Sequence, residues 1–254
     1  MERYTSLSVR RDASVLFVQL DVAEGRNTIT PTLIAELTRV LNTCGASISV
    51  IVLEGAPEVF CVGVDFETLH ARARAGQAMD VEPEALYALW QQLAEGPWVS
   101  IAHVRGRVNA GGVGFVAACD LVIADDAAVF SLSELLFGLF PACVMPFLVR
   151  RMGFQRAHYM TLMTSPLPVT QAQAWGLVDA SAANSQDLVR KHLLRLRRLS
   201  PTAVARYKAY MTKVNGVIGA LQEEAIAANR EMFSEPDTIA KIARYVEEGL
   251  FPWE

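Results

Sequence analysis

The first half of the chain alternates short apolar, β-branched runs with stretches of helical periodicity. Runs that predict strands cover residues 14–20, 49–53, 98–104, 121–124 and 128–132. Helical spacing follows Thr30 and Pro31, whose types suit an N-cap and a first helical position, and it recurs over 84–94. Buried strands that alternate with helices indicate a mainly parallel sheet with helical crossovers.

The pattern changes near Met145, after which we find no strand signal. Helical spacing then predicts helices over 155–163, 170–175, 185–199, 201–214, 217–233 and 236–248. We find no internal repeat and no linker, so we expect a βα core over 1–190 and a C-terminal helical region over 191–254. An end made only of helices often packs on another subunit, and this favours an oligomer.

Composition and charge exclude several classes of protein. Of the 254 residues, 52% are hydrophobic and 20% are charged, which excludes a disordered chain. The net charge of −4 gives no basic field for nucleic acid. The N-terminal residues are charged without an apolar run, and the uncharged stretch 157–178 has too many polar residues and prolines for a bilayer span. We therefore expect a cytoplasmic protein with no membrane and no nucleic-acid partner.

Four widely spaced cysteines bear on compartment and metal content. Three of them lie in apolar runs; the four are Cys44, Cys61, Cys119 and Cys143. This pattern favours reduced thiols over a disulfide framework or a zinc site. We find no clustered His, Asp and Glu spacing either, and we expect no metal.

Two glycine-centred segments carry the candidate chemistry. In residues 59–66, Gly63 permits a bend that other residues avoid. In residues 106–120, a strand ends, a glycine-rich turn follows and an apolar helix begins, so free N–H groups are available at the helix start. Each segment alone fits a tight turn equally well. Neither is a Rossmann or P-loop motif. Two backbone donors that converge on one carbonyl would form an oxyanion hole.

The order of these motifs carries a family resemblance. A Phe-Cys-x-Gly-x-Asp turn precedes a Gly-Gly turn, and then come Cys-Asp at 119–120, Phe-Ser-x-x-Glu at 130–134, a Phe-Pro turn and Ala-Trp-Gly-Leu-Val at 174–178. This order resembles the crotonase (enoyl-CoA hydratase/isomerase) superfamily over nearly the whole chain. The resemblance implies an α/β fold with a crotonase (ClpP-like) ββα spiral core and a C-terminal helical trimerisation region, in a homotrimer or hexamer.

The resemblance also assigns catalytic roles. It implies that the backbone N–H groups of Val64 and Gly111 hold the carbonyl oxygen of an acyl thioester. Hydratases of the family use two glutamates: Glu134 matches the second, whereas the first falls at Gly114 and is missing. Apolar neighbours predict a raised pKa for Glu134, as a proton carrier needs. The alternative is a carboxylate that pairs with Ser131 in a capping arrangement.

A single carboxylate restricts the reaction. It can move a proton between two carbons, or remove an α-proton and then protonate a leaving β-hydroxyl. The strings at 59–61, 103–106, 109–112 and 130–143 resemble dehydratases of polyketide β-branching. That resemblance implies dehydration of 3-hydroxy-3-methylglutaryl on an acyl-carrier protein to 3-methylglutaconyl. It implies no cofactor besides the CoA or phosphopantetheine that carries the substrate.

Alternatives remain at this level. An enoyl thioester isomerase also needs only one glutamate. The companion 3-methylglutaconyl decarboxylase typically lacks the counterpart of Glu134 and uses a lysine and a histidine, and the loop after the first turn has no lysine. A crotonase that binds thioesters without turnover is a further alternative.

Several side chains are candidates for substrate binding. Asp65 is either a second acid or a turn cap, and Asn109 either contacts the substrate or orders the loop. Gly112 belongs to the second glycine turn. Arg72 either meets the free carboxylate of the substrate or lies on a solvated helix face. A helix with five basic residues between 190 and 198 either suits an acidic carrier protein or is simply solvated.

Overall fold

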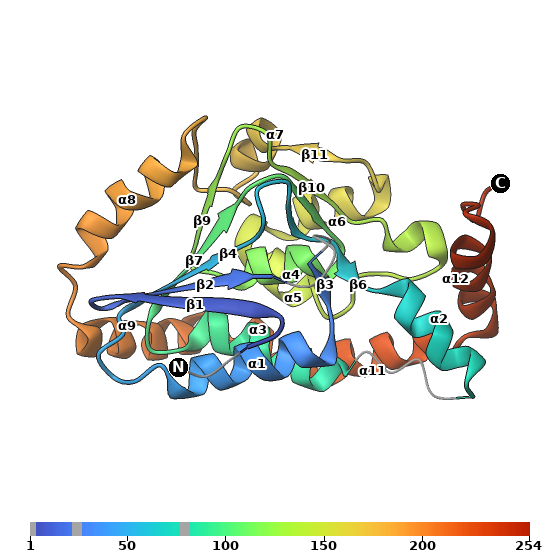
Figure 1. The fold of residues 1–254 in the computed structure, drawn as a ribbon, viewed down its shortest axis with the longest axis horizontal. Coiled ribbons are helices and arrows are strands. Elements are labelled where there is room, and N and C mark those ends of the chain that lie inside the picture. The colour runs from blue at the N-terminus through green and yellow to red at the C-terminus, as the bar shows by residue number, and fades with distance from the viewer. Residues whose placement is uncertain (1–3, 22–26, 77–81) are drawn as a thin grey trace.

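The computed structural model describes residues 4–21, 27–76 and 82–254, and it has two main sheets (Figure 1). The larger sheet has the order β1 (Leu7–Asp12), β2 (Val15–Leu20), β4 (Val50–Glu54), β7 (Val99–Val104), β9 (Leu121–Ala124) and β12 (Ala180–Ser181). Only β1 runs antiparallel to its neighbour. The predicted mainly parallel sheet is therefore confirmed.

A smaller sheet and a short strand pair hold the two glycine turns. The smaller sheet has the order β11 (Leu167–Pro168), β10 (Val129–Ser131), β8 (Arg107–Asn109) and β5 (Val59–Cys61). Strands β3 (Thr28–Ile29) and β6 (Gly63–Val64) pair separately. The absence of strands after Met145 was a wrong prediction, because β11 and β12 lie there. Each has two residues, which is too short to show a period in the sequence.

Helices surround the sheets, and most lie where the pattern placed them. They are α1 (Pro31–Thr43), α2 (Phe66–Arg74), α3 (Pro83–Glu95), α4 (Gly111–Ala118), the 3₁₀ turn η2 (Glu134–Phe137), α5 (Met145–Met152), α6 (Phe154–Met163), α7 (Val169–Ala174), α8 (Ser185–Leu196), α9 (Pro201–Val214), α10 (Val217–Ala220), α11 (Gln222–Ser234) and α12 (Pro236–Glu248). Thr30 caps α1 by accepting the Leu33 N–H at 3.1 Å, as predicted. The single helix predicted over 217–233 is divided at Leu221.

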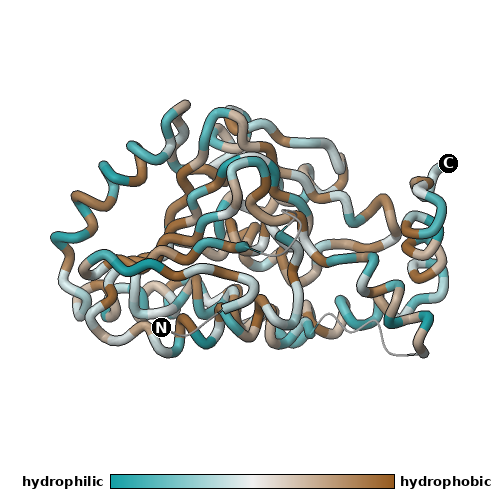
Figure 2. The backbone as a smooth tube through the Cα atoms, viewed as in Figure 1, coloured by the Kyte–Doolittle hydropathy of each residue, from teal (hydrophilic) through white to brown (hydrophobic). Residues whose placement is uncertain are grey.

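Helix α4 occupies the centre of the fold. It contacts α3, α5 and strands of both sheets, and its residues after Gly111 are buried. The helix is apolar on all its faces, as a helix buried on every side must be. Hydrophobic segments lie around it in Figure 2. Its first turn begins directly after β8, so the free N–H groups at its start are presented at the end of the smaller sheet.

Helix α12 closes one end of the molecule (Figure 1). Helix α12 packs on α2 and on η2, and the His70 ring bonds Glu247 at 3.0 Å between α2 and α12. Helix α8 lies at the opposite end of the molecule (Figure 1). Within the described residues, none of the helices has the length and apolar character that crossing a membrane requires.

The cysteines are free thiols, in agreement with the sequence prediction. Cys61, Cys119 and Cys143 are buried, and Cys44 is half-buried. Burial raises the pKa of each of the three buried thiols to about 12, so these side chains stay protonated and unreactive.

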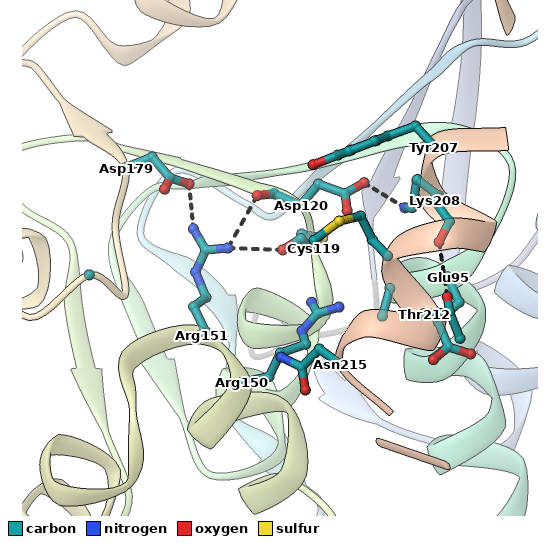
Figure 3. A pocket seen from close by; sticks show the side chains of 13 residues that line it. Glu95, Cys119, Asp120, Arg150, Arg151, Asp179, Tyr207, Lys208, Thr212 and Asn215 are labelled. Atoms are coloured by element: carbon teal, nitrogen blue, oxygen red, sulfur yellow. Dashed lines mark hydrogen bonds and ion pairs between the residues drawn. The ribbon is translucent and has the colours of Figure 1, made fainter. Parts of the chain in front are cut away.

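A polar cluster fixes the far end of α4 to the C-terminal region (Figure 3). Two arginines of α5 cap the last carbonyls of α4: Arg150 donates to Ala117 and Ala118, and Arg151 donates to Cys119. Lys208 of α9 is 6% exposed and donates to Asp120 Oδ2 at 2.6 Å. These bonds hold α4 against α5 and α9, so its opposite end, at Gly111, has a fixed position.

We expect Lys208→Met to lower the free energy of unfolding by about 3 kcal/mol. The variant leaves Asp120 without its cation, although Ser100 still donates to the carboxylate. Denaturant titration measures the change, and Lys213→Met at an exposed position of the same helix is the matched control. The double variant Lys208→Met/Asp120→Asn should recover part of the loss. If Lys208→Met is as stable as the control Lys213→Met, the ion pair between Lys208 and Asp120 has no structural role.

Candidate active site

The two glycine turns touch backbone to backbone. Gly63 has φ +88°, and a Cβ there would lie 3.2 Å from Gly111 N and 2.9 Å from Ala110 Cβ. A Cβ on Gly111 would in turn lie 3.8 Å from Gly63 Cα. Because Val64 follows Gly63 directly, the structure brings the two predicted oxyanion donors, Val64 and Gly111, to one place.

The second turn is held in a strained conformation. Ala110 has φ 50° and ψ −125°, a region that side chains with a Cβ rarely occupy. Its N–H donates to Ser131 O at 3.0 Å, and its carbonyl accepts from Val113 N at 2.9 Å. The hydrogen bond to Ser131 thus holds the turn on β10 and sets the orientation of the first peptide of α4. The N–H of that peptide has no partner within the helix.

Both turns open into a cavity of about 820 Å³. Five predicted site residues line it, namely Val64, Asp65, Asn109, Gly111 and Glu134. Its wall is otherwise mainly apolar, with Leu86, Trp90, Leu136, Phe137, Leu139 and Phe233 among the lining residues. This is a partly desolvated pocket with a few convergent polar groups, as acyl-group chemistry requires.

Glu134 is a buried carboxylate in the cavity wall. It begins η2, and its Oε2 is buried without a hydrogen-bond partner in the described part of the chain. Burial raises the pKa of Glu134 to about 7, although backbone hydrogen bonds at Glu134 and Ser133 lower it. The carboxylate therefore exchanges a proton near neutral pH, as its apolar sequence neighbours predicted.

The capping alternative for Glu134 does not match the contacts. The Ser131 hydroxyl donates to Asn109 Oδ1 at 2.8 Å, not to Glu134. Ser133 precedes η2 and makes no side-chain cap bond either. The unpartnered Oε2 is thus left for a molecule in the cavity.

Asn109 joins the oxyanion turn to the segment that carries Glu134. Its Oδ1 accepts from Ser131, and its Nδ2 donates to Ser133 Oγ at 3.1 Å. Asn109 precedes the turn at Ala110, and Ser133 precedes Glu134. These contacts favour the loop-ordering alternative, with Asn109 as a positioning residue.

Asn109→Ala is expected to lower kcat about 10- to 100-fold with a small change in KM. Loss of the amide lets two catalytic segments shift relative to each other, and a displacement of about 1 Å has effects of this size. Steady-state kinetics on the acyl thioester that the resemblance implies measures the change in kcat, with thermal unfolding as the folding control. A change confined to KM would instead show that Asn109 binds the substrate directly.

The contacts of three predicted substrate-binding residues indicate structural roles or a place outside the cavity. The three are Asp65, Gly112 and Arg72. Asp65 lines the cavity but caps α2, since its carboxylate accepts from Glu67 N at 3.1 Å and Thr68 Oγ1 at 2.7 Å. Gly112 is outside the cavity wall, and a Cβ there would lie 2.2 Å from Cys61 O, so it permits close packing of α4 on β5. Arg72 lies on α2 and is not part of the cavity wall.

Trp90 and Arg107 line the cavity, and the sequence analysis predicted neither of them as a site residue. The sequence predicted Trp90 as a core residue, and its side chain is 1% exposed. Arg107 occupies the same face of β8 as Asn109 by strand alternation, a signal that the sequence does contain.

Trp90 fills the space beside Gly114. A Cβ on Gly114 would lie 2.4 Å from Trp90 Cζ2. The indole is held edge-on against Phe115 and Phe147, with ring centroids 5.8 Å apart in each pair. No side chain fits at position 114 without moving this ring, so this part of the wall stays apolar.

Comparisons with known proteins place the chain in a family. A sequence model of the enoyl-CoA hydratase/isomerase family matches residues 10–254. The chain is 52% identical over 252 residues to the bacillaene synthase dehydratase PksH of Bacillus subtilis, covering 99% of this chain and 97% of that one. It is 30% identical over 237 residues to the 2,3-dehydroadipyl-CoA hydratase of Escherichia coli, covering 91% and 89%.

Solved structures show the same similarity in three dimensions. The crystal structure of a polyketide biosynthesis enoyl-CoA hydratase (pksH) from Bacillus subtilis superposes with a TM-score of 0.96 at 52% identity, covering 98% of this chain and 100% of that chain. An enoyl-CoA hydratase from Bacillus halodurans gives a TM-score of 0.86 at 20% identity, covering 94% and 99%, and shows the shared fold.

Proposed function

The chain belongs to the enoyl-CoA hydratase/isomerase family and has the expected crotonase fold, and from this premise we propose that it is a hydro-lyase of polyketide β-branching. It dehydrates a 3-hydroxy-3-methylglutaryl thioester on an acyl-carrier protein to the 3-methylglutaconyl thioester. One observation carries the proposal: Glu134, a buried carboxylate with a pKa of about 7, shares a cavity with both glycine turns. The similarity to a bacillaene synthase dehydratase supports the reaction type.

The proposed reaction uses one carboxylate twice. The thioester oxygen accepts from the backbone N–H groups of Val64 and Gly111, and Glu134 removes the α-proton. The enolate then expels the tertiary β-hydroxyl, and Glu134 returns the proton so that water leaves. One preorganised oxyanion donor typically contributes a factor of about 10²–10³ in rate. The two backbone donors stabilise the enolate and Glu134 moves the proton, and so we propose that no metal or cofactor takes part; the phosphopantetheine belongs to the substrate.

Two related activities are less favoured. An isomerase also needs one carboxylate, but the relative with 52% identity is named a dehydratase. The companion decarboxylase uses a lysine and a histidine. Neither residue type lines the cavity in the described parts of the chain.

The exposed apolar residues support the proposed assembly into a homotrimer or hexamer. Phe154 and Leu162 on α6 are 64% and 58% exposed, and Tyr207 and Tyr210 on α9 are 62% and 63% exposed. Large exposed side chains in groups are typical of interfaces. We further propose that the protein acts in the cytoplasm, where an acyl-carrier protein would meet it.

The predicted basic helix does not lie near the cavity. Arg190 pairs with Asp187 and Arg197 with Asp12, and α8 is at the opposite end of the molecule from α2 and α12 (Figure 1). A carrier protein on α8 would thus dock far from the site of the same protomer, which favours the solvated alternative for this helix.

Mass spectrometry of carrier-linked and CoA-linked 3-hydroxy-3-methylglutaryl thioesters tests the function. We expect a product that is lighter by one water, formed faster on the carrier protein. A product of unchanged mass would indicate isomerisation, loss of carbon dioxide would indicate decarboxylation, and either result would overturn the proposal.

A further inference from the structure

Acidic side chains outnumber basic ones in the described wall of the cavity. Three carboxylates, Asp65, Glu67 and Glu134, line it, whereas Arg107 is the one cation among the described lining residues. The proposed substrate carries a distal carboxylate and, on its carrier, a phosphate. A wall that bears only carboxylates would repel both groups, so a substrate of this class needs a cation on its path.

Arg107 lies two residues before Asn109 on β8, on the same cavity wall as Glu134. It begins β8 and pairs with Val129 of β10 and Val59 of β5. Alternate residues of a strand share a face, so Arg107 and Asn109 face the cavity about 7 Å apart, while Val108 between them is buried. Asn109 then leads through Ser133 to Glu134.

Arg107 is also available to a ligand. Its side chain is exposed, and it makes no hydrogen bond or ion pair with any residue that the structure describes. Other arginines near the core are occupied: Arg105 donates to Gly55 O, and Arg150 donates to carbonyls of α4. A guanidinium with all donors open binds a carboxylate or a phosphate through two parallel hydrogen bonds.

We propose that Arg107 is a specificity-determining residue that binds an oxyanion of the thioester substrate. The oxyanion is either the distal carboxylate of the acyl group or the phosphate of the pantetheine arm. The inference rests on the proposed function for the identity of the acyl group. It replaces Arg72, which lies outside the cavity wall, as the cation that meets the substrate.

The test compares four thioesters with wild type, Arg107→Gln and Arg107→Lys. The acyl group is 3-hydroxy-3-methylglutaryl or 3-hydroxy-3-methylbutanoyl, which lacks the carboxylate, and each is attached to phosphopantetheine or to pantetheine. We expect Arg107→Gln to lower kcat/KM about 10- to 100-fold only for thioesters that carry the recognised oxyanion, as for a lost charged hydrogen bond. Arg107→Lys should be intermediate. If Arg107 binds the carboxylate, wild type and Arg107→Gln should have equal kcat/KM on the thioesters that lack the carboxylate. If Arg107 binds the phosphate, the two should be equal on the thioesters that lack the phosphate.

Controls separate this inference from folding and from the proposed function. Arg195→Gln, an exposed arginine of α8 at the far end of the molecule, makes the same charge change and should leave all four rates unaltered. Equal losses on all four thioesters, or no loss on any, would overturn the role of Arg107. If wild type releases no water from any thioester, the proposed function fails, and calorimetric binding of the same four thioesters to wild type and Arg107→Gln still decides the inference.

Discussion

Replacement of Glu134 by Gln should lower kcat for water loss about 10³- to 10⁴-fold. General acid–base catalysis supplies about 10²–10⁴ in rate, and this residue acts in both proton transfers, so the upper part of that range applies. The amide keeps the size of the side chain, and thioester binding should therefore persist. Mass spectrometry measures turnover, and calorimetry measures binding.

A matched control exists in the same cavity. Glu67 also lines the wall but has no role in the proposed reaction, so Glu67→Gln should retain activity within a few-fold. If Glu134→Gln keeps most of its activity, another group carries the proton and the mechanism is wrong.

The pH dependence adds a second readout for Glu134. Because the α-proton is taken by the carboxylate form, kcat/KM should rise about tenfold per pH unit below pH 7 and level off above it. Stability changes in the opposite sense. A folded-state pKa of about 7, raised from 4.5, means that stability present below pH 4.5 is lost as the pH rises through 7. Glu134→Gln should thus unfold at a higher temperature than wild type at pH 8, and at a similar temperature at pH 4.5.

Gly114→Glu should lose both stability and dehydration activity, and it should gain no hydration of a plain enoyl thioester. Overpacking typically lowers stability by about 1–3 kcal/mol, and a carboxylate placed against the Trp90 ring adds a desolvation penalty. Displacement of Trp90 would also deform the cavity wall near Gly111. Thermal unfolding and product mass measure the two losses.

Two alanine variants isolate the steric cause. Gly→Ala inside a helix normally stabilises by about 1 kcal/mol. Gly114→Ala should destabilise instead, because its Cβ meets the indole, whereas Gly219→Ala, in α10 with open space around its Cβ, should be neutral or stabilising. A Gly114→Glu variant of native stability with new hydratase activity would contradict the explanation.

The sequence predicted those parts of the structure that depend on local pattern. Thr30 and Pro31 start α1, and the apolar run of β7 forms a central strand, because capping and periodicity act over a few residues. Strand β1 was missed, since all its residues after Leu7 are exposed and mostly polar or charged. Two-residue strands such as β12 form only because a neighbouring strand is already in place.

The motifs in the sequence predicted which residues share the cavity, whereas contacts between distant segments were missed. The glycine turns and Glu134 share one cavity, as the resemblance implied. Arg72 was a plausible cation from its position after the first turn, but α2 carries it away from the wall, and Arg107 is the cation that lines it. The contact of Trp90 with Gly114 joins α3 to α4, which no local pattern encodes.

The contact between Trp90 and Gly114 also has an evolutionary consequence. The two side chains compete for one volume, so position 114 cannot accept a larger residue while Trp90 stays as it is. A relative with an acidic residue at the position of Gly114 must have a smaller or displaced residue at the position of Trp90. In an alignment of such relatives the two columns should therefore covary. Conversion between one-carboxylate and two-carboxylate enzymes along a lineage then requires paired substitutions, with an unstable intermediate if the acidic residue comes first.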